Sequence, residues 1–247
     1  MNSFLKNLFS LDKKVKIYFV FSLIIIILSY LVYLFFDENT VNKLGAEDSF
    51  FENLTAISFL FASIIFIIIF FLKKKIIYLV FAVIFFIGMG EEISWGQRIF
   101  NYKTPEYFEK NNIQDEFNFH NLNIFDSKNN NGQYKAGLSY ILSVNFLYKL
   151  FWLVYGVIFP VVYLLSRFVK KTVDKIDVPV PPFVLGIIFL INWLLSRLIL
   201  SYLLPDGRSL QYYYTAGEIS EFGSAFIFMI LGAYFLQTAI KKRRLTA

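Results

Sequence analysis

Residues 17–36 read IYFVFSLIIIILSYLVYLFF, and this uncharged run decides the fold class. It is longer than the ~18 apolar residues that a helix needs to cross the hydrocarbon core of a bilayer. Similar runs recur along the chain, since 57% of its 247 residues are hydrophobic, 20% are aromatic and only 17% are charged. A soluble domain carries about 25% charged residues. The sequence therefore predicts an all-α, polytopic membrane helix bundle.

Hydropathy and charge divide the chain into about six transmembrane helices. We expect them at about 16–36, 54–72, 76–100, 147–168, 182–204 and 212–240, with a surface-lying segment at 138–146 before the fourth. Residues 101–135 are predicted to form an extracytoplasmic loop. In this loop, Thr104 as N-cap and Pro105 at the first helical position predict a short interfacial helix. Because no internal repeat or linker is visible, residues 1–247 are interpreted as a single transmembrane domain.

Basic side chains gather at the ends of alternate predicted spans. Fifteen of the 24 Lys and Arg residues lie in four short segments, 6–16, 73–75, 167–175 and 241–244, and most acids lie elsewhere. The positive-inside rule assigns all four segments to the cytoplasm. Both termini are therefore predicted to be cytoplasmic, which requires an even number of spans, in a multi-pass protein of the cell (inner) membrane. The net charge of +6 is then an orientation signal, and we expect no nucleic-acid partner.

The third predicted span becomes polar toward its outer end. Residues 88–98 read GMGEEISWGQR. A rise of ~1.5 Å per residue from the start of the span places Glu91 ~22 Å from the cytoplasmic boundary. On such a helix Glu91, Ser94 and Arg98 share one face, while Glu92 points ~100° away. The stretch therefore predicts carboxylates in the outer third of the ~30 Å hydrocarbon core.

Glutamates also lie in the outer part of the sixth predicted span. Glu218 and Glu221 follow one helical stripe with Tyr214, and Arg197 of the fifth span lies at a similar depth. A charge within the bilayer costs about 2.5–3.5 kcal/mol on insertion scales, so we expect these side chains to face the bundle interior. Because the glutamates outnumber the cations, they are predicted to share a polar site. The alternative is a structural ion-pair network with Arg197 and Arg98.

The predicted outer loop carries the only histidine of the chain. His120 stands in the stretch 117–121, FNFHN, where Phe alternates with polar residues as in a segment at the membrane interface. A fold-back of this segment would bring His120 to the glutamates, and packing within the loop is the alternative. The stretches 90–98 (GEEISWGQR) and 118–121 (NFHN) together resemble a pattern of uncharacterised multi-pass bacterial membrane proteins. This resemblance covers residues 88–121 and implies no activity.

Composition excludes several kinds of site. The chain has no cysteine, so disulfides, thiolate metal sites and cysteine nucleophiles are excluded. One histidine is too few for membrane hydrolases and desaturases whose metals are held by several. The sequence does not identify a cofactor. Oxygen ligands and one imidazole would suit a hard divalent cation such as Mg, Mn or Ca better than zinc.

The sequence therefore predicts a carboxylate-rich polar site that opens to the extracytoplasmic side. Our first hypothesis is a membrane-embedded enzyme that acts on a lipid or lipid-linked substrate. Its candidate catalytic residues are Glu91, Glu92, His120, Glu218 and Glu221. Its candidate substrate-binding residues are Arg98, Arg197, Trp95 and Tyr214. Membrane lipids are the expected partners, and a homo-oligomer or a membrane complex stays open.

Two other functions use the same residues. A proton- or cation-coupled transporter or channel would use the carboxylates as an ion path. A structural accessory subunit of a membrane complex would use them for helix packing. The spans at 16–36 and 54–72 offer almost no polar group at membrane depth, which disfavours a continuous path. Whether the protein is an enzyme is not decided by the sequence.

Overall fold

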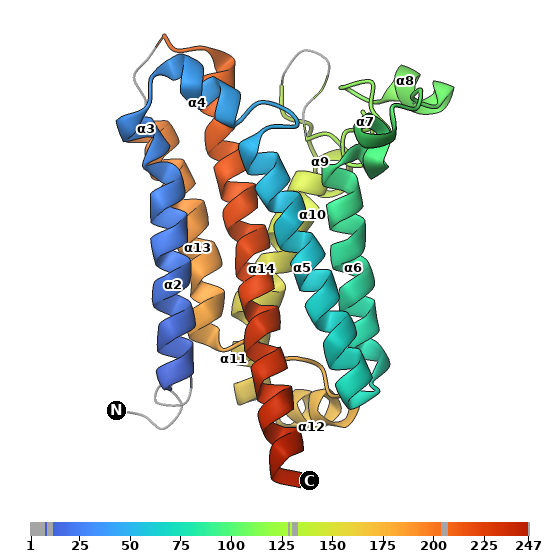
Figure 1. The fold of residues 1–247 in the computed structure, drawn as a ribbon, viewed down its shortest axis with the longest axis vertical. Helices are drawn as coiled ribbons and strands as arrows, with labels where there is room; N and C mark the ends of the chain where they lie inside the picture. Colours follow the sequence, from blue (N-terminus) through green and yellow to red (C-terminus); the bar gives the residue numbers. More distant parts are fainter. Residues whose placement is uncertain (1–7, 9–11, 128, 130–132, 204–206, 247) are drawn as a thin grey trace.

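The computed structural model describes residues 8, 12–127, 129, 133–203 and 207–246, and they form a helical bundle (Figure 1). Five stretches are long and apolar enough to cross a membrane: Lys13–Phe35, Phe50–Lys73, Val144–Leu165, Phe183–Ser201 and Leu210–Lys241. No strand forms within the described ranges, where Asn112 and Leu122 make an isolated β-bridge. The predicted all-α polytopic membrane bundle is confirmed.

Helical passes run along the bundle axis in alternating directions (Figure 1). The first is α2 (Lys13–Tyr30) with the short α3 (Val32–Phe35), the second is α5 (Phe50–Lys73), and the third is α6 (Ile76–Glu92). The fourth joins α10 (Val144–Trp152), the π-helical η2 (Leu153–Ile158) and α11 (Phe159–Leu165). The fifth is α13 (Phe183–Leu198) with the π-helical η3 (Ile199–Leu203), and the sixth is α14 (Leu210–Thr246).

The third pass is shorter than predicted. Instead of continuing to residue 100, α6 ends at Glu92 after 17 residues, which span ~26 Å. The cause is a run of left-handed backbone, with φ of 46° at Ser94, 53° at Trp95 and 80° at Gly96. Residues in this conformation cannot continue a right-handed helix. The chain therefore turns away from the axis of α6 before the short α7 (Gln97–Phe100).

The two ends of the bundle carry different elements, and we call them the loop end and the basic end (Figure 1). The loop end carries α4 (Glu38–Leu44), α8 (Glu106–Asn111) and α9 (Leu138–Ile141). The basic end carries α12 (Arg167–Ile176), the start of α2 and the end of α14. The described parts of all four predicted basic segments thus lie at one end, as an even number of passes requires.

Element boundaries at the loop end differ from the predictions in two places. Thr104 is not an N-cap, because α8 begins at Glu106 after Pro105, and the Thr104 hydroxyl instead donates to the Asp115 carbonyl oxygen at 2.7 Å. The fourth pass begins at residue 144 rather than 147, because the Ser143 hydroxyl accepts a capping hydrogen bond from the Phe146 amide at 3.3 Å.

Aromatic side chains fill the middle of the bundle. The Phe66 ring stacks on Phe81 and Phe85, with ring centroids 5.1 and 5.5 Å away. The Phe228 ring of α14 lies 5.1 Å from Phe85 and 4.8 Å from Phe189. All five side chains are buried. They form a tightly packed apolar layer, which we call the aromatic layer, between the loop end and the basic end.

A proline shapes the fourth pass. Pro160 has no N–H to donate to the carbonyl of Gly156, and its ring crowds that carbonyl, which disrupts a regular helix. The helix is widened into η2 just before it, and the Phe159 amide donates to the Val154 carbonyl. Gly156 lies in this widened turn and packs directly against Gly186 of α13. The crossing of these two helices is therefore made by backbone rather than by side chains.

At the loop end, an ion pair joins the start of α4 to the start of α14 and makes a pH-dependent contact. The Ser209 amide (2.8 Å) and the Arg208 guanidinium (2.9 Å) both donate to the Glu38 carboxylate, and together they lower its pKa from the ordinary value of 4.5. A carboxyl whose folded-state pKa is lowered stabilises the fold above its unfolded-state pKa, and this contribution is lost as pH falls through the folded-state value.

We therefore expect the wild type to lose its small stability advantage over Glu38→Gln as pH falls below about 4.5. The effect is small because the pair is exposed. Thermal unfolding of both proteins in the same detergent, from pH 7 to pH 3.5, measures it. A difference between the two melting temperatures that stays constant over this range would contradict the assignment.

Candidate functional site

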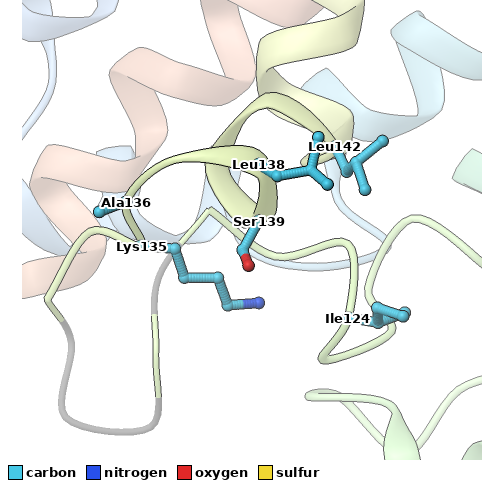
Figure 2. Close-up of a pocket in the computed structure, with 6 residues that line it drawn as sticks. All are labelled: Ile124, Lys135, Ala136, Leu138, Ser139 and Leu142. Carbon is cyan, nitrogen blue, oxygen red and sulfur yellow. The ribbon is translucent and has the colours of Figure 1, made fainter.

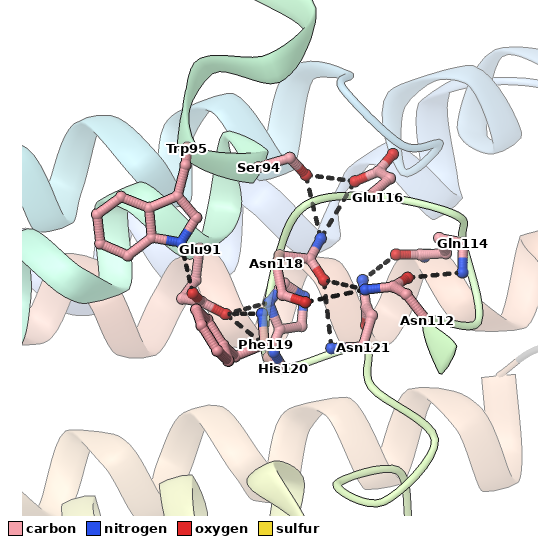
Figure 3. Close-up of polar contacts among 10 residues, drawn as sticks. All are labelled: Glu91, Ser94, Trp95, Asn112, Gln114, Glu116, Asn118, Phe119, His120 and Asn121. Carbon is pink, nitrogen blue, oxygen red and sulfur yellow. Dashed lines mark hydrogen bonds and ion pairs between the residues drawn. The ribbon is translucent and has the colours of Figure 1, made fainter. Parts of the chain in front are cut away.

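Glu91 fastens the loop that contains His120 to the end of α6 (Figure 3). Its Oε2 accepts hydrogen bonds from the backbone amides of Phe119 (2.7 Å) and His120 (2.9 Å). The same oxygen lies 3.4 Å from Nδ1 of the His120 ring. The expected meeting of His120 with a glutamate is therefore made with Glu91. If the ring carries its proton on Nδ1, Nε2 is left as a base on the opposite side of the ring.

Trp95 positions Glu91 from the other side. Its Nε1 donates to Glu91 Oε1 at 2.7 Å (Figure 3). The left-handed backbone at residues 94–96 turns the indole back over Gly90, where an added Cβ would lie 2.9 Å from the ring. Trp95 is a candidate substrate-binding residue from the sequence, and its hydrogen bond also positions Glu91. In the stretch GEEISWG, Gly90 therefore leaves the space that the Trp95 indole occupies.

A buried polar network also holds the loop next to the contacts of Glu91 (Figure 3). The Ser94 hydroxyl bonds to the Glu116 carboxylate, and Asn118 Nδ2 donates to Ser94 Oγ at 3.1 Å and to Glu116 Oε2 at 3.2 Å. Asn112 Nδ2 donates to Asn118 Oδ1 at 2.8 Å. Glu116 and Asn118 are buried and were not singled out from the sequence. The alternation of Phe with polar residues does reveal them, because the polar side chains face inward while Phe119 is 49% exposed.

A second group of acids lies between α5, α6 and α14. The Glu92 charge interacts with those of Glu52, Glu218 and Glu221, and we call these four residues the carboxylate cluster. Glu92, Glu218 and Glu221 are half-buried and make no hydrogen bond to any described residue. Three of the four members were predicted to meet. Glu52 was missed because it lies in the first turn of α5, where the sequence resembles a loop boundary.

The cations near the carboxylate cluster are not the predicted ones. Lys149 of α10 and His120 of the loop act electrostatically on Glu221. Arg197 is exposed on α13, with its guanidinium carbon 5.9 Å from the Trp193 ring centroid, and its charge acts on Lys149. The structure therefore places Arg197 at the margin of the cluster and not within it.

The other two predicted substrate-binding residues are Tyr214 and Arg98. Tyr214 is 52% exposed on α14. The side chain of Arg98 lies outside the described residues. For the part of the chain that is described, no group of three or more His, Asp or Glu side chains is arranged to hold a metal ion. The hard divalent cation considered from the sequence thus has no ready-made site among these residues.

One buried hydroxyl lies near the acids of the carboxylate cluster. The Tyr148 oxygen of α10 makes no hydrogen bond of ordinary length to a described residue, and its polar neighbours are Glu221, Glu92 and the Ser224 side chain. A buried hydroxyl without a partner is unfavourable by about 1–3 kcal/mol. Among the described residues, Tyr148 and the carboxylates of the cluster thus keep hydrogen-bonding capacity that close contacts do not fill.

Two hollows accompany the site. A pocket of about 470 Å³ at the loop end is lined by Ile124, Lys135, Ala136, Leu138, Ser139 and Leu142 (Figure 2). It contains no candidate catalytic residue. An open, almost wholly apolar groove of about 510 Å³ runs between α6 and the fourth pass, from Leu147 to Phe159. Its end at Leu147 lies one residue from Tyr148.

Comparison of the chain with protein-family models, with curated proteins and with solved structures gives no match, so its function is argued from the site itself.

Proposed function

We propose that the protein is a membrane-embedded enzyme that uses general acid–base catalysis on a lipid or lipid-linked substrate. The loop end is extracytoplasmic and the basic end is cytoplasmic in this proposal, in the inner membrane of the cell. The clustering of basic segments at one end supports this orientation. The carboxylate cluster then lies in the outer half of the membrane.

The observation that carries the proposal is the contact of His120 with the Glu91 carboxylate. Glu91 binds its backbone and its Nδ1, while Glu221 and Glu52 are the acids on which its charge acts. A carboxylate that orients an imidazole leaves the other ring nitrogen available as a base. His120 would accept a proton from a water or hydroxyl nucleophile, and a protonated glutamate of the carboxylate cluster would give one to the leaving group.

The test is turnover of a mixed bacterial lipid extract by the full-length protein in vesicles. We expect a product, detected by mass spectrometry, whose rate of formation falls at least about tenfold in His120→Gln and in Glu92→Gln, because each removes a proton-transfer group. Glu106→Gln is the control, since Glu106 is an exposed residue of α8 paired with Lys110. Absence of product with the wild type, or equal rates in all variants, would contradict the proposal.

A transporter is the competing function, because unpartnered carboxylates also bind protons and cations. The aromatic layer argues against it. The buried rings of Phe66, Phe85 and Phe228 lie between the carboxylate cluster and the basic end, and they offer no polar group for an ion. Proton or cation flux across vesicles, lost in Glu92→Gln without any lipid product, would favour the transporter.

A further inference from the structure

The apolar groove between α6 and the fourth pass ends at the basic end of the bundle. On the fourth pass it extends from Leu147 to Phe159, which is ~18 Å at a rise of ~1.5 Å per residue. Ile77, in the first turn of α6, and Val178, just after α12, line its basic end. Its volume of about 510 Å³ lies within the range of about 300–1,000 Å³ of ligand sites. Its length is close to the ~15 Å that one leaflet contributes to the hydrocarbon core. The groove therefore has the size of a site for one acyl chain.

Measured contacts join the basic end of the groove to two neighbouring elements. The Val178 amide donates to the Val173 carbonyl oxygen of α12 at 3.2 Å. On the α6 side, the Tyr78 hydroxyl donates to the Asp177 carboxylate at 3.1 Å, and Lys73 Nζ donates to the same carboxylate at 2.8 Å. The end of the groove is thus bordered by the turn between α5 and α6 on one side and by the end of α12 on the other.

Both of these bordering elements carry lysines. Lys74 and Lys75 in the α5–α6 turn are exposed, as is Lys175 near the end of α12. No acid among the described residues forms an ion pair with any of these three lysines, whereas Lys73 is paired with Asp177. Neighbouring cations without acidic partners favour an anionic lipid headgroup over a neutral one. The groove therefore ends at a positively charged surface.

The pattern of α12 indicates that it lies at the level of lipid headgroups (Figure 1). Its apolar face contains Val173, which is buried, and Phe168 and Ile176, which are 80% and 49% exposed. The opposite face carries its basic residues, Arg167, Lys170, Lys171 and Lys175. A helix with one apolar face and one basic face binds in the interface of a membrane that contains anionic lipids. The end of the groove and the headgroups of that leaflet are then at the same depth.

A second copy of the chain is another occupant that an apolar groove could accept. A two-fold dimer across the groove would place the same surface of each copy face to face. Both α5–α6 turns and both α12 helices would then meet at one end, and their like charges would repel each other. An anionic headgroup compensates the same charges. The charge pattern therefore favours a lipid over a second copy.

We propose that the groove binds one acyl chain of an anionic phospholipid from the leaflet at the basic end, and that Lys74, Lys75 and Lys175 bind its phosphate. The headgroup of this lipid lies at the opposite end of the bundle from His120. The site is separate from the carboxylate cluster, so this inference goes beyond the proposed function and does not depend on it.

Equilibrium binding of lipids to the delipidated full-length protein in detergent tests the headgroup. The probes are phosphatidylglycerol and phosphatidylcholine with identical acyl chains. We expect phosphatidylglycerol to bind at least about tenfold more tightly, because each nearby lysine attracts its net negative charge. The double variant Lys74→Gln, Lys75→Gln should reduce this preference to less than about threefold. The matched control, Lys43→Gln with Lys103→Gln, removes the same charge from exposed lysines outside the site and should leave the preference unchanged.

A second pair of variants tests the acyl chain. Leu150 lines the groove and is 42% exposed, whereas Leu164, on the same pass, is 38% exposed and does not line it. Leu150→Trp should weaken the binding of both lipids by about tenfold, because the indole takes the space of several buried methylene groups. It should leave the preference for phosphatidylglycerol intact. Leu164→Trp should change neither affinity.

Each part of the proposal has an outcome that overturns it. Equal binding of the two lipids to the wild type would discard the headgroup site, and unchanged affinities in Leu150→Trp would discard the acyl-chain site. A protein dimer in the same detergent that Leu150→Trp dissociates would show that a second copy occupies the groove. His120→Gln should bind both lipids as the wild type does, so the lipid site and the enzymatic function are tested separately.

Discussion

Replacing Gly186 with Ala should destabilise the protein by about 3 kcal/mol or more, because overpacking a core with no slack is unfavourable on this scale. A Cβ at this position would lie 1.7 Å from the carbonyl oxygen of Gly156 and 2.5 Å from its carbonyl carbon. Both atoms belong to backbone, so no change of rotamer relieves the clash. The helices α13 and η2 would have to separate, and the stacked pair Trp152–Phe189 beside them would lose its contact.

Equilibrium unfolding in mixed detergent micelles measures this effect. Gly217→Ala is the matched control, since Gly217 lies in α14 and an added Cβ there meets nothing within 4 Å. Helix propensity alone makes that substitution neutral or favourable by up to about 1 kcal/mol. Equal stability of the two variants would show that the α13–η2 crossing is not as close as described.

Replacing Asn192 with Ala should destabilise the protein by about 2 kcal/mol, the sum of interhelical hydrogen bonds at about 0.6 kcal/mol each and a small cavity. Asn192 is fully buried on α13. Its Nδ2 donates to the Ser220 carbonyl at 2.7 Å and to Ser224 Oγ at 3.2 Å, and its Oδ1 accepts from the Tyr30 hydroxyl at 3.3 Å. One side chain thus joins α2, α13 and α14.

The same unfolding assay tests this role, with Asn145→Ala as control because Asn145 is exposed near the start of α10. Asn192→Leu should not restore stability, since Gly223 packs against the amide so closely that an added Cβ would lie 2.6 Å from it. A branched apolar side chain does not fit this flat space. Full stability of the leucine variant would mean that the site needs volume rather than hydrogen bonds.

Hydropathy was sufficient to predict most of the bundle, because each pass must satisfy its own backbone and bury or expose only apolar side chains. It failed at residues 93–100, where a helix was predicted and the chain turns. The cause is the backbone conformation of Ser94 and Trp95, which are not glycine and have no composition signal for positive φ. Helical spacing predicted that Arg98, Ser94 and Glu91 share one helix face. Because α6 ends at Glu92, this spacing does not apply beyond that residue.

The grouping of the acids could be predicted because charged side chains are unfavourable in lipid, but the cation near them could not. Glu92, Glu218 and Glu221 were expected to meet because charged groups avoid lipid, and the charges of Glu218 and Glu221 do act on Glu92. The identity of their cation depends on which helices are neighbours, and no one-dimensional pattern contains that information. Lys149 therefore took the place expected of Arg197, and Tyr148 was not considered.

The widened turn at Pro160 has a mechanical consequence. In a regular helix the amide of residue 160 would bond to the Gly156 carbonyl, and Pro160 has no such N–H; this carbonyl packs closely against Gly186 of the adjoining pass. The two passes then touch through rigid main chain, without a flexible linkage that would let one slide along the other. Tyr148 and Lys149 lie about two turns from this crossing, in the same pass. The crossing therefore fixes their position along the bundle axis, opposite α14.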